Sequence, residues 1–231
     1  MLQRKFNTIG MVVAMDKELS PFLQKSTAKI EKYNVSGYDV FYYQINDKNV
    51  YVIKSGIGEI YASSATSILV SVFKCELILN FGVVGSLTDD ISVLDAVVVS
   101  GVVHYDFDLS KIDNTVVGQY PNYDSPIIEC NKDLVNLALN VNGSLKKAIC
   151  ASADKFVADE DIKDKLHSNF NADVCDMECA GVLLTCNVAN VPCLIIKAVS
   201  DGKGGAEEFN RRVKSASKIY LDTVYEIINL V

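Results

Sequence analysis

The sequence lacks the features that mark membrane, secreted and nucleic-acid-binding proteins. No apolar run reaches the roughly 18 residues that a membrane span needs. The N-terminal segment is charged and then apolar only over Ile9–Met15, with no small-residue cleavage site, so it predicts a first core strand rather than a signal peptide. The net charge is −7 and no basic block exceeds the pair Arg211 and Arg212, so neither a membrane nor a nucleic acid is an expected partner.

Paired metal-ligating residues are also scarce. The seven cysteines are odd in number, contain no CxxC pair and lie mostly in apolar segments, which is typical of reduced, buried thiols in a cytoplasmic protein. The chain has only two histidines, His104 and His167, far apart in sequence. In "HYDFD" an extended chain would put His104, Asp106 and Asp108 on one face, which leaves a metal site as a minor alternative. We otherwise expect no metal and no cofactor.

Apolar segments of strand length alternate with longer segments of helical spacing. With 231 residues, 49% of them hydrophobic, the chain can bury a large core, and no linker or internal repeat divides it. We expect one α/β domain over residues 1–231, with a central mixed, largely parallel β-sheet flanked by helices. The expected strands are Ile9–Ala14, Val40–Gln44, Val50–Lys54, Leu77–Phe81, Ala96–Ser100, Ala148–Ala151 and Cys193–Val199. The expected helices are Glu59–Phe73, Asn131–Asn140, Asp159–Asn169, Glu178–Ala189 and Glu207–Leu230, with one more after Met15.

Three acids lie at the edges of apolar segments, where they indicate a site rather than a surface. Glu18 follows the first strand, and Glu178 begins a helix after the strand-like "ADVCD". Asp201 ends the run "IIKAVSD". Ligands of α/β sheets gather at the carboxyl ends of strands. Taken singly, each acid also fits a structural role, as a first-turn charge of a helix or as a turn residue.

Residues near Asp201 and Glu178 are expected to neutralise, orient or cap. If the chain stays extended, Lys197 lies on the same side as Asp201 and would neutralise it, while Ser200 would orient its carboxyl. Asp176, two residues before Glu178, is expected to cap the helix and to do no more.

Two glycine-rich segments and one long irregular segment complete the pattern. "SGIGEIYA" (Ser55–Ala62) runs from a strand through a glycine loop into a helix, and "NFGVVGSL" (Asn80–Leu87) is expected to do the same. Such loops bring backbone N–H groups to a ligand, although neither is a GxGxxG or Walker A motif. Residues 104–126 form an irregular segment of a length typical of a lid, a binding loop or an interface.

Read in order, the segments "IGMVVAMDKEL", "SGIGEIYAS", "NFGVVGSL", "SADKFV", "DMECAG" and "KAVSDGKGG" resemble the 5′-methylthioadenosine/S-adenosylhomocysteine nucleosidases of the nucleoside phosphorylase superfamily. The likeness runs from about Ile9 to the C-terminus. It implies a nucleoside phosphorylase-like fold and hydrolysis of the N-glycosidic bond of 5′-methylthioadenosine, S-adenosylhomocysteine or a related 5′-substituted adenosine. Adenine release, a place in methionine salvage, a cytoplasmic location and a homodimer come with it.

The resemblance also implies a role for individual residues. Glu18 would activate water, and Asp201, with Ser200 beside it, would protonate N7 of adenine. Such an acid must keep its proton near neutral pH, which requires a water-poor position. The implied substrate-binding residues are Ile57, Val84, Gly85, Phe156, Val157, Met177, Glu178 and Lys197, together with Leu109 and Pro121, which would reach into the neighbouring subunit's site.

The choice between hydrolase and phosphorylase depends on arginine. Phosphorylases of this superfamily bind phosphate with arginines, but this chain has only Arg4, Arg211 and Arg212, so water is the expected nucleophile. A purine nucleoside phosphorylase, or a nucleoside-binding protein with impaired catalysis, are the alternatives.

Several positions depart from the family pattern. Lys197 stands in place of an arginine, and Val83 and Val84 replace a small or hydroxyl residue and an alanine. Ala206 falls where an aromatic is expected, with Phe209 close by. The 5′ substituent therefore stays open among homocysteine-thio, methylthio, unsubstituted 5′-deoxy and futalosine-type groups.

Overall fold

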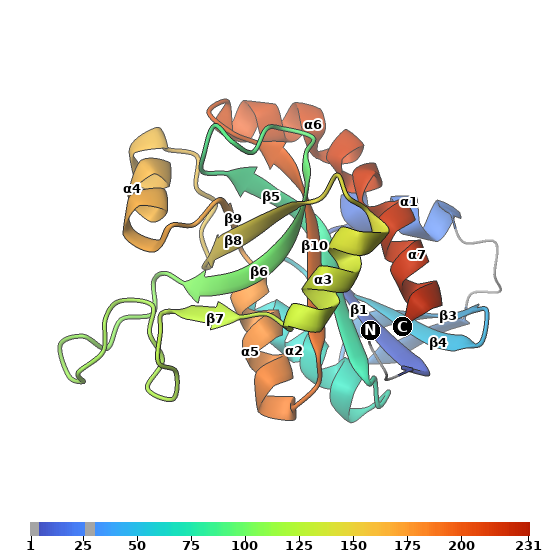
Figure 1. The fold of residues 1–231 in the computed structure, drawn as a ribbon. Coiled ribbons are helices and arrows are strands. Elements are labelled where there is room, and N and C mark those ends of the chain that lie inside the picture. Colours follow the sequence, from blue (N-terminus) through green and yellow to red (C-terminus); the bar gives the residue numbers. More distant parts are fainter. Residues whose placement is uncertain (1–4, 26–30) are drawn as a thin grey trace.

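The computed structural model describes residues 5–25 and 31–231, and Figure 1 shows their arrangement. Helices lie outside a ten-stranded mixed sheet. The elements are β1 (Thr8–Val13), α1 (Asp16–Lys25), β2 (Glu31–Val35), β3 (Tyr38–Ile45), β4 (Lys48–Lys54), α2 (Glu59–Ser71), β5 (Leu77–Ser86), β6 (Ala96–His104), β7 (Ile127–Glu129), α3 (Lys132–Val141), β8 (Lys146–Ser152), α4 (Glu160–Phe170), β9 (Val174–Asp176), α5 (Cys179–Ala189), β10 (Cys193–Asp201), α6 (Gly205–Ile219) and α7 (Leu221–Leu230).

Part of the sheet closes on itself. The strand order is β10-β6-β8-β9-β5-β1-β4-β3-β2, and β10 also pairs with β5, so five strands form a small barrel-like core. β1 runs parallel to β4 and β5, and β10 runs parallel to β5. The carboxyl ends of β1, β4, β5 and β10 therefore meet at one edge, where ligands of α/β proteins bind. The α/β fold with a mixed sheet is confirmed.

Burial explains which strands the sequence reveals. Every residue of β5 and β10 is buried, as expected for near-continuous apolar runs covered on both faces. β2 is exposed over four of its five residues and carries no apolar pattern, so the sequence gives no signal for it.

Two expectations about local structure are wrong. Asn80–Leu87 is not a glycine loop that leads into a helix, because β5 continues through it to Ser86 and pairs with β10 up to Gly85. The expected helix Glu207–Leu230 is two helices, α6 and α7, which meet at Tyr220. Residues 105–126 contain no helix or strand, as expected, and project from the body in Figure 1. Within residues 5–25 and 31–231, no helix is long and apolar enough to cross a membrane.

An aromatic cluster fixes helix α1, which carries Glu18. The Phe22 ring is fully buried and lies 5.6 Å from the Tyr43 ring, 5.8 Å from the Phe81 ring and 5.1 Å from the Tyr225 ring, measured between centroids. These rings belong to β3, β5 and α7, so one side chain of α1 contacts three other elements.

We expect Phe22→Ala to lower the free energy of unfolding by about 3–5 kcal/mol, because it leaves a cavity among three rings. Urea unfolding measures the loss. Phe22→Leu should cost less, and Leu230→Ala, at an exposed position of α7, serves as the control. A Phe22→Ala loss no larger than that of the control would contradict the role of this cluster.

Candidate active site

Glu18 is a buried acid held by two backbone amides. Its side chain lies in the first turn of α1, where Oε2 accepts a hydrogen bond from Met15 N at 2.9 Å. Oε1 accepts one from Val83 N in β5, also at 2.9 Å. Burial raises the pKa of Glu18, and Lys197 and the two amides oppose that rise. A carboxyl group of raised proton affinity is suited to take a proton near neutral pH.

Gly82 provides the space for this arrangement. A Cβ atom at this position would lie 2.6 Å from Glu18 Oε1 and 3.6 Å from Lys197 Nζ. The absence of a side chain therefore lets β5 approach both the acid and the ammonium group. Val83 and Val84, the two departures that follow, are buried in the strand.

Lys197 neutralises Asp176, not Asp201. Its Nζ lies 3.0 Å from Asp176 Oδ2, and both side chains are almost fully buried. The expectation that Lys197 partners Asp201 is wrong because a register shift between Val199 and Asp201 breaks the alternation of side chains along β10. Burial raises the pKa of Asp176, but Lys197 and the hydrogen bonds from Cys179 and Ser152 outweigh that effect and leave the pKa lowered.

Asp176 is more than the helix cap that the sequence indicates. Both of its carboxylate oxygens lie 3.2 Å from Cys179 N, which is a capping contact at the start of α5. Oδ1 also accepts a hydrogen bond from Ser152 Oγ at 2.6 Å. Together with the ion pair to Lys197, these contacts make Asp176 the centre of a buried polar network.

Glu178 joins α5 to the loop before α2. It is the N-cap residue of α5, and its Oε1 accepts a hydrogen bond from Gly58 N at 3.0 Å. Gly58 has a φ of 109°, and a Cβ there would lie 2.6 Å from Asp154 Oδ1, so this position requires glycine. Burial and the neighbouring Asp176 raise the pKa of Glu178 to about 8.

Glu59 is a fourth buried acid, which sequence analysis missed. At the start of α2 it looks like an ordinary first-turn charge, yet its Oε1 lies within hydrogen-bond distance of Ser152 Oγ and its Oε2 accepts a hydrogen bond from Gly181 N. Burial and Asp176 raise the pKa of Glu59 to about 7. Ser152 thus connects the carboxyl groups of Glu59 and Asp176.

Three carboxyl groups, those of Glu18, Asp176 and Glu178, therefore interact with one ammonium group, and Glu59 is connected to them through Ser152. Asp176 takes the ion pair with Lys197, and the pKa values of Glu59 and Glu178 rise instead. Two like charges in a low-dielectric interior cannot both be ionised cheaply, so these two acids keep their protons below about pH 7.

Asp201 lies at the end of β10 and has its own cation. Oδ2 lies 3.2 Å from Lys163 Nζ in α4, and Oδ1 lies 2.9 Å from Ser200 Oγ. Ser200 Oγ is also within 3.2 Å of Val84 O. Burial raises the pKa of Asp201, while Lys163 and Ser200 lower it. Lys163 was not expected, because a lone lysine in a charged helix gives no sequence signal for burial.

The last residues of β5 connect these groups. Glu18 contacts Val83, Ser200 contacts Val84, and a Cβ at Gly85 would lie 3.0 Å from Asp201 Oδ2. Strand residues rise about 3.3 Å each, so the two acids meet β5 at points about 7 Å apart. Glu178 is close enough to Glu18 for the charge of Glu18 to act on its pKa. The three expected acids therefore belong to one edge of the sheet.

Apolar residues of the expected site lie partly around these acids. The Phe156 ring is 42% exposed and contacts the Phe209 ring edge to face at 5.5 Å, whereas Ala206 is exposed. Phe209 therefore places an aromatic ring beside Phe156, three residues after Ala206. Ile57, beside Gly58, is 52% exposed. Val157 is buried and Met177 is half-buried.

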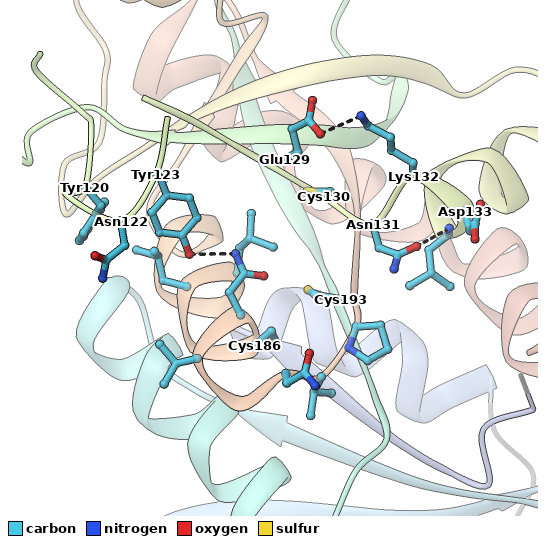
Figure 2. A pocket seen from close by; sticks show the side chains of 18 of the residues that line it. Tyr120, Asn122, Tyr123, Glu129, Cys130, Asn131, Lys132, Asp133, Cys186 and Cys193 are labelled. Atoms are coloured by element: carbon cyan, nitrogen blue, oxygen red, sulfur yellow. Dashed lines mark hydrogen bonds and ion pairs between the residues drawn. The ribbon is translucent and has the colours of Figure 1, made fainter. Parts of the chain in front are cut away.

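Leu109 and Pro121 do not join the site within one chain. Both belong to the projecting loop, and no hydrogen bond or ion pair among the described residues connects them to Glu18, Glu178 or Asp201. Pro121 instead lines a cavity of about 1210 Å³ beside α5, shown in Figure 2. There the hydroxyl oxygen of Tyr123 accepts a hydrogen bond of 3.1 Å from the side-chain amide of Asn187 in α5.

Neither candidate metal cluster has the chemistry of a metal site. The turn after β6 puts His104 Nε2 2.9 Å from Asp106, while Asp108 turns away to accept a hydrogen bond from Ser110 N. Ligand atoms of Cys150, Asp176 and Cys179 lie within 4.8 Å of one another, but Asp176 is already paired with the Lys197 ammonium group. A cation there would face a buried positive charge.

Comparisons with known proteins show which sequences this chain resembles. Residues 8–229 match the family model of the phosphorylase superfamily. The chain is 32% identical over 208 residues to an aminodeoxyfutalosine nucleosidase of Campylobacter jejuni, covering 87% of this chain and 89% of that protein. It is 29% identical over 233 residues to a 5′-methylthioadenosine/S-adenosylhomocysteine nucleosidase of Oceanobacillus iheyensis, covering 97% and 98% of the two chains.

A solved structure supports the same conclusion. The native structure of futalosine hydrolase of Helicobacter pylori strain 26695 superposes with a TM-score of 0.92 at 27% sequence identity, covering 97% of this chain and 98% of that chain. The resemblance indicated by the sequence motifs is confirmed at the level of the superfamily.

The crowding of acids predicts a pH-dependent stability. The pKa of Glu59 is raised from 4.5 to about 7, so between these values the folded state binds more protons than the unfolded state, and stability falls as the pH rises. We expect Glu59→Gln, which imitates the protonated acid, to gain stability relative to the unsubstituted protein. The gain should grow from pH 5 to pH 8 and reach on the order of 3 kcal/mol.

Urea unfolding at several pH values measures this difference. Glu226→Gln, at an exposed position of α7, is the control and should show no such trend. A difference between Glu59→Gln and the unsubstituted protein that does not vary with pH would show that Glu59 is ionised in the folded state throughout.

Proposed function

The chain belongs to the phosphorylase superfamily, and on that premise we propose that it is an N-ribosyl hydrolase that releases adenine from a 5′-substituted adenosine. The observation that carries this proposal is the placement of two buried acids along the end of one strand. Glu18 and Asp201 meet β5 at residues 83 and 85, with Glu178 close to Glu18. Inverting glycosidases separate their two carboxyl groups by about 6.5–9.5 Å, which leaves room for water on the face opposite the leaving group.

Asp201 is the proposed acid. Adenine leaves poorly as an anion, and a proton delivered to N7 turns it into a neutral leaving group. Burial raises the pKa of Asp201 above its ordinary value, which keeps the proton available at higher pH than in water. Ser200, within hydrogen-bond distance of Oδ1, holds the orientation of the carboxyl group.

Glu178 and Glu18 are the proposed partners of the sugar and the water. As the N-glycosidic bond lengthens, positive charge builds on the ribose, and a carboxylate near it stabilises that charge and accepts hydrogen bonds from the hydroxyls. The positive charge on the ribose favours the ionised form of Glu178 as the N-glycosidic bond breaks. Glu18 takes a proton from the attacking water, for which its raised pKa is suited. Met177, Phe156, Val157 and Ile57 would pack against the nucleoside.

The cations near the site favour water over phosphate as the nucleophile. Lys197 and Lys163 are both buried and each is already paired with a carboxylate. Arg211 and Arg212 are exposed on α6, and Arg4 lies outside the described residues. A phosphate ion would therefore meet no unpaired cation among these groups and no guanidinium fork.

The relatives narrow the substrate to 5′-substituted adenosines, without choosing among them. Proteins named for aminodeoxyfutalosine and for 5′-methylthioadenosine and S-adenosylhomocysteine resemble this chain to a similar degree. Phe156 and Phe209, which are both partly exposed and in ring contact, would border the 5′ substituent. The distance between the two rings would then limit the size of the substituent that the site accepts.

We propose that a second copy of the chain covers the solvent-exposed side of the site. Exposed apolar side chains begin at the loop next to Glu178 and continue onto α2, where Ile60 is 75% exposed and Tyr61 is 58% exposed. α2 packs beside α5, on which Val188 is 89% exposed. Large exposed apolar side chains on two helices that pack together favour an interface here. The projecting loop with Leu109 and Pro121 would then reach the partner's site.

Hydrolysis and phosphorolysis give different products, so the function is tested by incubation with 5′-methylthioadenosine, S-adenosylhomocysteine or aminodeoxyfutalosine, with and without phosphate. We expect free adenine and the free 5′-substituted ribose in phosphate-free buffer, with no gain from added phosphate. Asp201→Asn should lower kcat at least about a hundredfold, because general acid catalysis contributes that much. Binding of the nucleoside, followed by calorimetry, should survive.

The possible results separate the three functions. Formation of a ribose 1-phosphate only when phosphate is present would identify a phosphorylase. Binding without any adenine release by the unsubstituted protein would identify a nucleoside-binding protein. An unchanged kcat in Asp201→Asn would remove Asp201 from the mechanism.

The interface is tested by light scattering on the protein in solution. We expect a dimer, and we expect Ile60→Asp to produce monomers with reduced activity, since the charge falls within the apolar surface. Leu230→Asp, at an exposed position of α7, should leave the dimer intact. A monomeric unsubstituted protein with full activity would contradict the proposed cover.

A further inference from the structure

Lys163 is a buried cation with no evident role in holding the helix that carries it. It lies in the first turn of α4, is 4% exposed and has Leu166 as the other buried side chain of that helix. Its Nζ lies 3.2 Å from Asp201 Oδ2 and 2.6 Å from Gly202 O. A buried ion pair is weak evidence for stability, because the desolvation of both charges offsets their attraction. The burial of this charge therefore calls for an explanation other than the packing of α4.

The position of Lys163 relative to Asp201 supplies one. The ammonium group contacts Oδ2, whereas Ser200 contacts Oδ1, so the two oxygens have different partners. An ammonium group has only donors and cannot accept a hydrogen bond. The carboxyl oxygen that faces it, Oδ2, must therefore stay unprotonated. A proton on the Asp201 carboxyl group is therefore confined to Oδ1.

We propose that Lys163 is the positioning residue of Asp201, which keeps the transferable proton on Oδ1 and stabilises the carboxylate that remains after transfer. The inference rests on the proposed function, in which the O–H bond of Asp201 breaks as a bond from N7 of adenine to hydrogen forms. The ammonium group keeps its own protons throughout. Its positive charge faces the negative charge that appears on Asp201 in this step.

The charges around the pair are consistent with this role. Burial raises the pKa of Asp201, Lys163 and Ser200 lower it, and Glu208 of α6 raises it. Lys163 also lines a surface cavity of about 680 Å³. The other titratable groups that line this cavity are Asp89, Asp90, Glu160, Asp164, His167 and Lys203, and Cys175 of β9 lies near both members of the pair. Most of these are acids, so removal of Lys163 leaves Asp201 among groups that disfavour its ionisation.

The pH profile of kcat/KM distinguishes this role from a purely structural one. Since Asp201 must be protonated to act, activity falls on the alkaline side as Asp201 ionises. We expect Lys163→Met to move that alkaline limb upward by at least about one pH unit, because an opposite charge within about 4–6 Å shifts a carboxyl pKa by one to three units. Lys163→Arg should keep the limb in place. Lys165→Met, at an exposed position of the same helix, is the matched control and should change nothing.

A direct titration makes the test independent of turnover. Protein labelled with carbon-13 at the aspartate carboxyls reports the Asp201 titration by NMR, with Asp201→Asn to identify its signal. The midpoint should rise in Lys163→Met and in Lys163→Gln, which keeps a donor for Gly202 O if the methionine variant does not fold. Equal midpoints in these variants and an unmoved alkaline limb would overturn the inference. Absence of adenine release by the unsubstituted protein, with a shifted midpoint, would instead overturn the proposed function.

Discussion

The site is built on a shortage of positive charge. The charge of Lys197 acts on Glu18, Asp176 and Glu178, and among these acids it forms an ion pair with Asp176. Glu59 is connected to Asp176 through Ser152. Because the remaining acids are desolvated and lack a cation of their own, their pKa values rise. Groups that gain and lose protons near neutral pH are what acid–base chemistry on a nucleoside requires. The same crowding makes the folded state sensitive to pH.

The closed part of the sheet is what brings these groups together. β5 pairs with both β1 and β10, so the acid after β1 and the acid at the end of β10 approach the same strand from opposite sides. Gly82 and Gly85 remove the side chains that would otherwise separate β5 from Glu18 and Asp201. The glycines of "NFGVVGS" therefore serve the site by close approach of a strand, and not as an anion-binding loop.

The fold and the three acids could be predicted from the sequence because each acid ends an apolar run, and apolar runs are a local signal. The partners of the acids could not. The bulge between Val199 and Asp201 depends on strand pairing, and it turns Asp201 away from Lys197 and toward α4. Lys163 and Glu59 lie in the first turns of helices, where charged residues are ordinarily solvated. Only the tertiary structure shows that these two are buried.

Lys197 stands where the resemblance leads us to expect an arginine, and the two side chains would orient the acids differently. An arginine fork can hold two carboxylates at once, whereas an ammonium group is a point charge that here contacts Asp176 Oδ2. Glu18 is held instead by the amides of Met15 and Val83, and Glu178 by that of Gly58. Backbone amides orient a carboxyl group in either protonation state without adding a full positive charge. This organisation of the site is consistent with the proposed use of water, since it offers no unpaired cation among Lys163 and Lys197 to a phosphate ion.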